Sequence, residues 1–360
     1  MDSFAELGPL ARDASRWRSL DALFSLAAAG TLAGVLVACG GGGGGADPAP
    51  PAPAPAPAPS PAPAPTPSAP IAAQLTVPTP VGYDADRLAA FKRLNEIRLS
   101  AGLGMLAQNT EMDQAAQAHA EWMIANDLLT HDETAGTPGF TGTNWPRRDE
   151  TFGYVPVEGA EVIAQGTASA GVDVLVNSAY HRTAILAFEP VDVGIGWTGG
   201  TASNVIEPLV MDITRPGTDT VRGLGQMAQP SIHGAAIWPL DGALGVPLRL
   251  GPEIPNPVPK QDVLTLGTPA SVTVEESKTI SATQFTLTNS ATGASVPTQL
   301  LTSENDPNFL IPHSFIAAIP LAPLSSNTAY RVDFSGSTVQ FGSGTVEQVS
   351  RVWSFTTGSQ

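Results

Sequence analysis

The segment from Gly40 to Pro70 limits most strongly where this chain can fold, because it cannot build a packed core. Six glycines, Gly40 to Gly45, are followed by Ala and Pro repeats up to Pro70. Glycine leaves the backbone free, whereas closely spaced prolines favour extended polyproline II. At about 3.1 Å per residue the repeats would span about 70 Å. We therefore assign residues 39–80 to an unfolded linker and expect all globular structure downstream of it.

The residues before the linker have the pattern of an export signal. Arg16 and Arg18 precede an apolar run over residues 22–37 that ends in LVAC. The run is shorter than the roughly 20 apolar residues that cross a bilayer, so we predict a cleaved signal peptide over residues 1–38. The ending resembles the lipobox of bacterial lipoproteins, in which the cysteine is acylated. Cys39 is the only cysteine, so it has no disulfide partner, and we predict its lipidation.

The lipobox resemblance implies a protein anchored to a membrane through acylated Cys39. The implied location is the bacterial cell envelope, at the outer membrane or on the secreted side. The 33 acidic and 17 basic residues give a net charge of −16. Binding to phosphate backbones needs clusters of Lys and Arg, which the sequence lacks, so we expect no nucleic-acid partner. We expect a monomer.

Helical periodicity begins after about residue 81. Apolar residues in 84–100 recur at helical spacing, and Gly102 follows as a helix-ending glycine. A second helix is predicted from Asn109 or Thr110 to Asp127, and a third over about residues 171–188. Strands are predicted at 191–198 and 204–214, where β-branched residues gather. Helices followed by strands favour an α+β domain over residues 81–216. The residues on the apolar stripe of the first helix are Leu88, Phe91, Leu94 and Ile97.

The predicted second helix carries a histidine on its apolar face. Met112, Ala116, His119 and Met123 are separated by four, three and four residues, so they share one side of the helix. We interpret His119 as a hydrogen-bonded core histidine rather than a ligand.

Six blocks of this region resemble, in order, the bacterial branch of the CAP superfamily, also called SCP domains. The family includes cysteine-rich secretory, antigen 5 and pathogenesis-related 1 proteins. The resemblance implies an α–β–α sandwich with a central antiparallel sheet, and a cleft that holds two His and two Glu. The blocks are LNEIRLSAGLGML, AAQAHAEWM, LLTH, GYVPVEGAEVIAQG, NSAYHR and DVGIGW.

The resemblance also implies which residues line the cleft. By motif position, His131 matches the first histidine, Glu161 the glutamate of the family's usual GEN turn, and His181 the second histidine. The position of the other glutamate is Ser178 here, and Leu175 stands where a tryptophan is frequent. These departures weaken any function that needs both carboxylates.

The chemistry of such a cleft leaves three interpretations open. His131, His181 and Glu161 could hold a divalent cation such as zinc, because three protein ligands with an open position form a common zinc site. The same groups could perform acid–base chemistry on a bound water. They could also be a polar network that braces loops. A Ser178–His181 pair one helical turn apart is conceivable, but such neighbours are frequent by chance.

Residues 221–360 lose helical periodicity and alternate polar and apolar residues in short runs. This pattern predicts an all-β sandwich. Blocks such as FTLTNSATGASVP and WSFTTG resemble bacterial immunoglobulin-like modules of the Big_5 type. Trp238 and Trp353 are expected in the core, and His233 and His313 are interpreted as structural. We expect a spacer or adhesion role for this region.

The sequence is compatible with three functions. The first is an envelope protein whose CAP domain binds a lipid, an envelope polymer or a divalent cation. The second is a metal-dependent hydrolase that uses His131, Glu161 and His181, and the third is an adhesive protein with a vestigial cleft. No GxSxG turn is present, and Cys39 is remote from the motifs. We therefore expect binding rather than turnover.

Overall fold

The structure is a computed structural model, and it describes residues 73–199, 208–216 and 234–359. The described residues belong to one compact unit, Pro67–Gln360. The predicted signal peptide, Cys39 and most of the linker lie outside the described residues, and so does His233. Among the helices described, none is both long and apolar enough to cross a membrane.

A four-stranded sheet forms the centre of the N-terminal half, with the strand order β1-β3-β4-β2. Strands β3, β4 and β2 pair antiparallel, and the short β1 pairs parallel with β3. The predicted strands at 191–198 and 204–214 correspond to β3 and β4, and residues 204–207 are not described. The bounds are β1 Ala107–Gln108, β2 Pro156–Gln165, β3 Asp192–Trp197 and β4 Pro208–Pro216.

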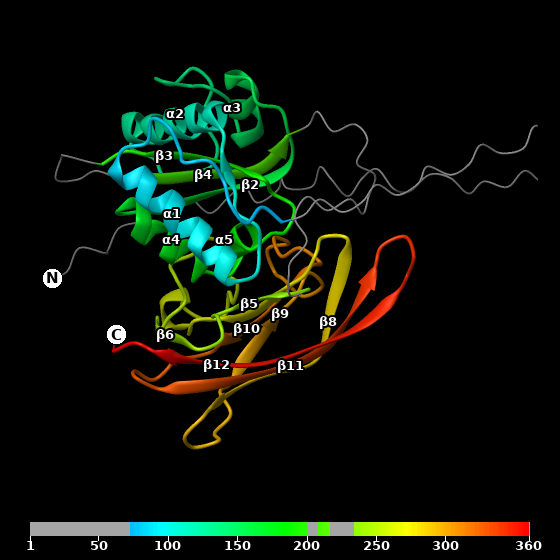
Figure 1. The fold of residues 1–360 in the computed structure, drawn as a ribbon. Coiled ribbons are helices and arrows are strands. Elements are labelled where there is room, and N and C mark those ends of the chain that lie inside the picture. The colour runs from blue at the N-terminus through cyan, green and yellow to red at the C-terminus, as the bar shows by residue number, and fades with distance from the viewer. Residues whose placement is uncertain (1–72, 200–207, 217–233, 360) are drawn as a thin grey trace, which may run out of the picture. The chain divides into compact units, whose positions relative to one another are not determined.

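Helices cover both faces of this sheet (Figure 1). Helix α2 packs on β3 and β4, with α3 beside it, whereas α1, α4 and α5 form the other layer. This three-layer α–β–α arrangement is the one that the family resemblance implied. The bounds are α1 Ala85–Ser100, α2 Thr110–Asn126, α3 Trp145–Phe152, α4 Ala168–Val176 and α5 Tyr180–Ile185.

The first two helices lie close to their predicted bounds. Asp84 accepts a hydrogen bond from the Arg87 amide, and Asn109 accepts one from Met112, so each satisfies an otherwise unpaired N–H group. Asp127 ends α2 in the left-handed conformation. The prediction of one helix over 171–188 is wrong, because the chain breaks between α4 and α5.

Local side-chain bonds accompany this break. Asn177 Nδ2 donates to Asp173 O at 2.7 Å, and Ser178 Oγ donates to Leu175 O at 2.7 Å. Such bonds compete with the continuation of a helix. Ser178 therefore lies between two helices rather than on one helical face with His181.

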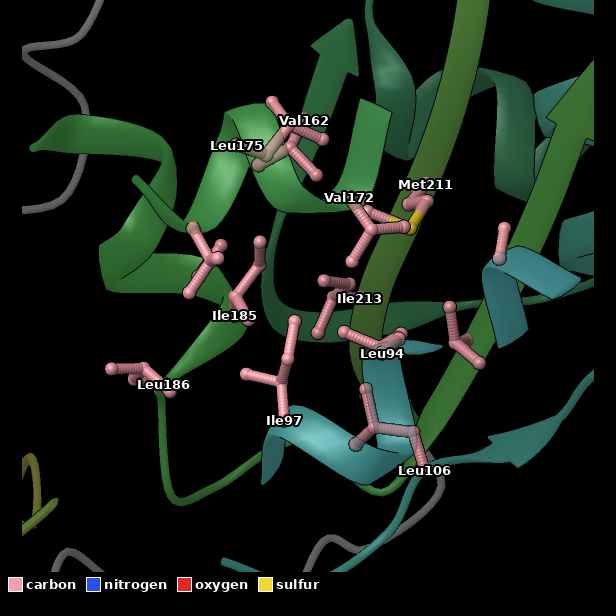
Figure 2. Close-up of a cluster of buried hydrophobic side chains, with 14 of the residues drawn as sticks. Leu94, Ile97, Leu106, Val162, Val172, Leu175, Ile185, Leu186, Met211 and Ile213 are labelled. Carbon is pink, nitrogen blue, oxygen red and sulfur yellow. The ribbon is translucent and has the colours of Figure 1, made fainter. Parts of the chain in front are cut away.

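The two faces of the sheet bury different residues. Val162 of β2 and Met211 and Ile213 of β4 pack against Leu94, Val172 and Ile185 of the α1–α4–α5 layer (Figure 2). On the other face, helix α2 lies directly on the backbone of β3. A Cβ added to Gly194 would lie 2.3 Å from Met112 C, and one added to Gly196 would lie 2.2 Å from Ala116 C. The two glycines of DVGIGW therefore permit the close approach of α2.

Two further four-stranded sheets form the C-terminal half, with orders β5-β7-β10-β9 and β6-β12-β11-β8. One apolar cluster takes residues from both sheets, including Val272, Ile316, Phe334 and Phe355, so the sheets pack face to face. Trp353 is buried in this cluster, as expected. The bounds are β5 Ala236–Trp238, β6 Ala243–Val246, β7 Ala270–Thr273, β8 Lys278–Asn289, β9 Thr298–Leu301, β10 Phe315–Pro320, β11 Ala329–Gln340 and β12 Val346–Thr357.

Candidate binding site

Glu161 lies in the middle of strand β2, where the family's motif would place a turn. Side chains alternate along a strand, so neighbouring residues face opposite layers. Val162 and Ala164 face the α1–α4–α5 layer, and Ile163 packs against the α2 cluster. Glu161 therefore points to the side of α2 and α3, where it is buried.

Two side chains hydrogen-bond to the Glu161 carboxylate on this side. His131 Nδ1 lies 2.8 Å from Oε1, and Arg148 Nη2 of helix α3 donates to Oε2. Arg148 Nη1 also donates to the His131 carbonyl at 3.0 Å. Because the ionised carboxylate only accepts, Nδ1 of His131 carries the hydrogen of the first bond. The buried guanidinium thus fixes both Glu161 and the loop that presents His131.

A second buried pair supports the first. His119 of α2 lies with Nδ1 2.9 Å from Glu133 Oε1 and with Nε2 2.9 Å from Thr130 O. Glu133 also accepts from the amides of Thr141 at 2.6 Å and Gly142 at 3.2 Å. Both ring nitrogens of His119 face acceptors, and the ring donates both bonds only when it is doubly protonated. His119 is fully buried and hydrogen-bonded, as the sequence predicted.

The charges of this network set the protonation of its carboxyl groups. Burial opposes ionisation of Glu161, but Arg148 and the two histidines outweigh it and lower the pKa of Glu161 to about 2. Burial also works against ionisation of Glu133, yet the bonds from His119 and the two amides bring its pKa below the usual value. Both carboxylates are therefore charged at neutral pH.

Asp149 differs from Glu161 and Glu133, because its pKa is raised rather than lowered. It is fully buried beside Arg148 and Glu161, and neither of its carboxyl oxygens has a hydrogen-bond partner. Burial and repulsion from Glu161 raise the pKa of Asp149 to about 7, although Arg148 acts in the opposite direction. At neutral pH this side chain holds a proton for part of the time.

His131 is the part of the network that water can reach. Its side chain is 41% exposed, whereas those of Glu161, Arg148 and His119 are fully buried. Leu128 and Leu129, which precede it in the chain, are exposed as well, and so is Phe140 beside the Glu133-bound Thr141. The exposed surface of the site therefore combines one imidazole with apolar side chains.

His181 belongs to a different cluster. It lies on α5, in the helical layer on the other face of the sheet, and its Nδ1 is 3.2 Å from Ser178 Oγ. The same nitrogen is 3.2 Å from Glu253 Oε1 of the C-terminal half. In the described part of the chain, the hydrogen bonds and ion pairs of His131 and Glu161 do not include His181. The structure thus brings His131 to Glu161 and Ser178 to His181, but it separates the two pairs.

The structure does not bring the three residues of the predicted zinc site, His131, Glu161 and His181, together. Nδ1 of His131 is already bonded to Glu161, and the third donor lies on the far side of the sheet. Within residues 73–199, 208–216 and 234–359, no group of three or more His, Cys, Asp or Glu side chains is placed to hold a metal ion. Zinc binding stays a prediction.

Sequence reasoning missed four members of the two clusters: Glu133, Arg148, Asp149 and Glu253. The first follows LLTH by two residues, and the next two lie in WPRRDE, in a helix that was not predicted. Only 14% of the residues are charged. The charged residues that follow the histidine motif were therefore a signal that could have pointed to the site. No local signal connects Glu253 with His181, because 72 residues separate them.

Comparison with known proteins identifies the N-terminal half. Residues 91–211 match the family model described as CAP: Cysteine-rich secretory protein family. An extracellular protein of Bacillus anthracis that contains an SCP domain has a TM-score of 0.31 and 21% identity, over 36% of this chain and 40% of its own. An outer surface protein of Borrelia burgdorferi has a TM-score of 0.30 and 20% identity, over 35% and 89%. The curated proteins give no match. On the evidence of the family model, residues 91–211 form a CAP domain.

Proposed function

We propose that this chain is a secreted or envelope-anchored protein whose CAP domain binds a hydroxyl-rich envelope polymer through His131. The export pattern before Cys39 and the secretory character of the family support this location. Acylation at Cys39 and an immunoglobulin-like class for the C-terminal sheets are parts of the same proposal. The Pro-rich linker would then provide reach from the membrane.

The observation that carries the proposal is the state of the His131 ring. Its Nδ1 hydrogen is committed to Glu161, so Nε2 is the ring nitrogen left for a ligand, and in the neutral ring it carries the lone pair. The described residues give this nitrogen no partner. A fixed and exposed acceptor is suited to a hydroxyl or amide donor. Leu128 and Leu129 supply apolar contact area beside it.

Other features of the chain favour a neutral polymer and binding without turnover. The net charge of −16 opposes approach to strongly anionic surfaces. Ser178 Oγ is buried and donates to Leu175 O, so it is not available to His181 as a nucleophile. These observations support a binding module over the hydrolase alternative.

Replacing His131 by Ala should reduce binding of the intact chain to isolated peptidoglycan sacculi by about tenfold, because it removes a hydrogen bond and its preorganised acceptor. Co-sedimentation with sacculi measures the bound fraction. Asp132→Asn is the matched control, since Asp132 is the exposed neighbour and should leave binding unchanged. Co-sedimentation with phosphatidylcholine vesicles is measured in parallel, to distinguish binding to a polymer from binding to a lipid surface. Equal sedimentation of the wild type and His131→Ala, or binding to vesicles alone, would refute the proposal.

A further inference from the structure

The second histidine segment of the CAP domain is held by a carboxylate from the C-terminal half. Glu253 Oε2 accepts from the Ala179 amide at 2.9 Å, and Oε1 accepts from the amides of Tyr180 at 2.5 Å and His181 at 3.2 Å. His181 Nδ1 lies 3.2 Å from the same Oε1. The Glu253 side chain is fully buried. One carboxylate therefore satisfies the first amides of α5, which a helix start leaves unpaired.

Arg182, next along α5, makes the reciprocal contact. Its Nε donates to Val176 O at 2.6 Å within the CAP domain, and its Nη1 donates to Pro269 O at 2.9 Å and Ser271 Oγ at 3.1 Å in the C-terminal half. The guanidinium is completely buried, and burial lowers its pKa to about 9 although Glu253 opposes the shift. A buried arginine that bonds both halves indicates a permanent contact.

Apolar packing extends across the same contact. Trp238 of β5 belongs to the core cluster of the α1–α4–α5 layer, and its Nε1 donates to Asn177 Oδ1 at 3.1 Å. Tyr180 belongs to a cluster with C-terminal residues and donates to Asp306 Oδ1 at 2.5 Å. A Cβ at Gly251 would lie 2.7 Å from Val174 O, so the two backbones approach as closely as glycine allows.

We propose that the C-terminal sheets are an intramolecular partner of the CAP domain, with Glu253 as the positioning residue that fixes α5 and closes His181 to ligands. The carboxylate absent at Ser178 is thus replaced at His181 by one from the partner region. Ligand access is confined to His131, and the C-terminal half serves as part of the CAP fold rather than as a detached spacer.

The inference predicts a local loosening when Glu253 is changed in the full chain. Glu253→Ala leaves the amides of Ala179, Tyr180 and His181 without an acceptor, so their hydrogen exchange should accelerate at least about tenfold. Exchange of the α2 and β3 amides should not change. Glu253→Gln keeps one acceptor oxygen and should give an intermediate rate. Hydrogen-exchange mass spectrometry of peptides that cover residues 175–186 measures the effect.

Chemical modification tests the closure of His181 directly. Its side chain is 16% exposed in the presence of Glu253. Diethyl pyrocarbonate should modify His181 several-fold faster in Glu253→Ala and at an intermediate rate in Glu253→Gln, with the rate at His131 as internal reference. Glu304→Ala, at an exposed position of the same half, is the matched control and should behave as the wild type. The inference would be overturned if both Glu253 variants showed unchanged hydrogen exchange and an unchanged rate of His181 modification. If Glu253→Ala does not fold, the same two measurements on Glu253→Gln decide.

Discussion

Replacing Arg148 by Ala should lower the free energy of unfolding by about 3–5 kcal/mol at pH 7. The guanidinium is fully buried and is the strongest partner of Glu161. Removing it leaves a buried carboxylate with a single hydrogen-bond partner, His131, and also frees the His131 carbonyl. Breaking a buried pair costs more than the pair contributes, because one charge stays buried without compensation. Urea denaturation followed by tryptophan fluorescence measures the change.

The neighbouring arginine provides the control for this variant. Arg147 has a largely exposed side chain and pairs with Glu150 on the surface of α3. Ion pairs on the surface contribute little to stability, so Arg147→Ala should lower the free energy of unfolding by less than about 1 kcal/mol. If Arg148→Ala cost no more than Arg147→Ala, the buried network would not be what stabilises this face of the sheet.

Replacing Asp149 by Asn should stabilise the protein at pH 8 by roughly 1–3 kcal/mol and have little effect at pH 4. The folded-state pKa of about 7 lies above the ordinary value of 3.8, so the folded protein holds the proton more tightly than the unfolded chain. The resulting stability is fully present below about pH 3.8 and is lost as the pH rises through 7. Asparagine is neutral at every pH, so its advantage should appear over that window.

Thermal denaturation of both proteins between pH 4 and 8 tests the Asp149 prediction. The difference in melting temperature should grow with pH and level off above 7. Asp132→Asn makes the same chemical change at an exposed aspartate and should give a constant difference. A difference for Asp149→Asn that does not vary with pH would show that Asp149 is ionised throughout and that its burial is tolerated.

Local rules predicted the helical part of the fold well. The spacing of apolar residues located α1, and the same spacing with the cap at Asn109 located α2, because such signals act within a few residues. The break between α4 and α5 was missed because its cause lies partly in Glu253, far away in the sequence. Helix α3 was missed because it buries few residues and its first turn contains a proline.

The prediction of the site was limited in the same way by contacts between residues far apart in the sequence. The structure brings His131 to Glu161, and the alternation of side chains along β2 directs Glu161 away from the helical layer that contains His181. Glu161 faces α2, whereas α5 lies on the opposite face of the sheet. Arg148 and Asp149 could not be placed from spacing alone, because their role depends on tertiary contacts with that strand.

The central claim is that His131 and His181 occupy separate environments, one open and one closed by Glu253. A zinc titration of the intact chain, followed through the NMR signals of the two imidazole rings, tests it most directly. A shared ion would require both rings within bonding distance of about 2.1 Å. We predict that the two signals respond independently and do not saturate together. Parallel shifts of both rings that saturate at one zinc per chain would contradict the account.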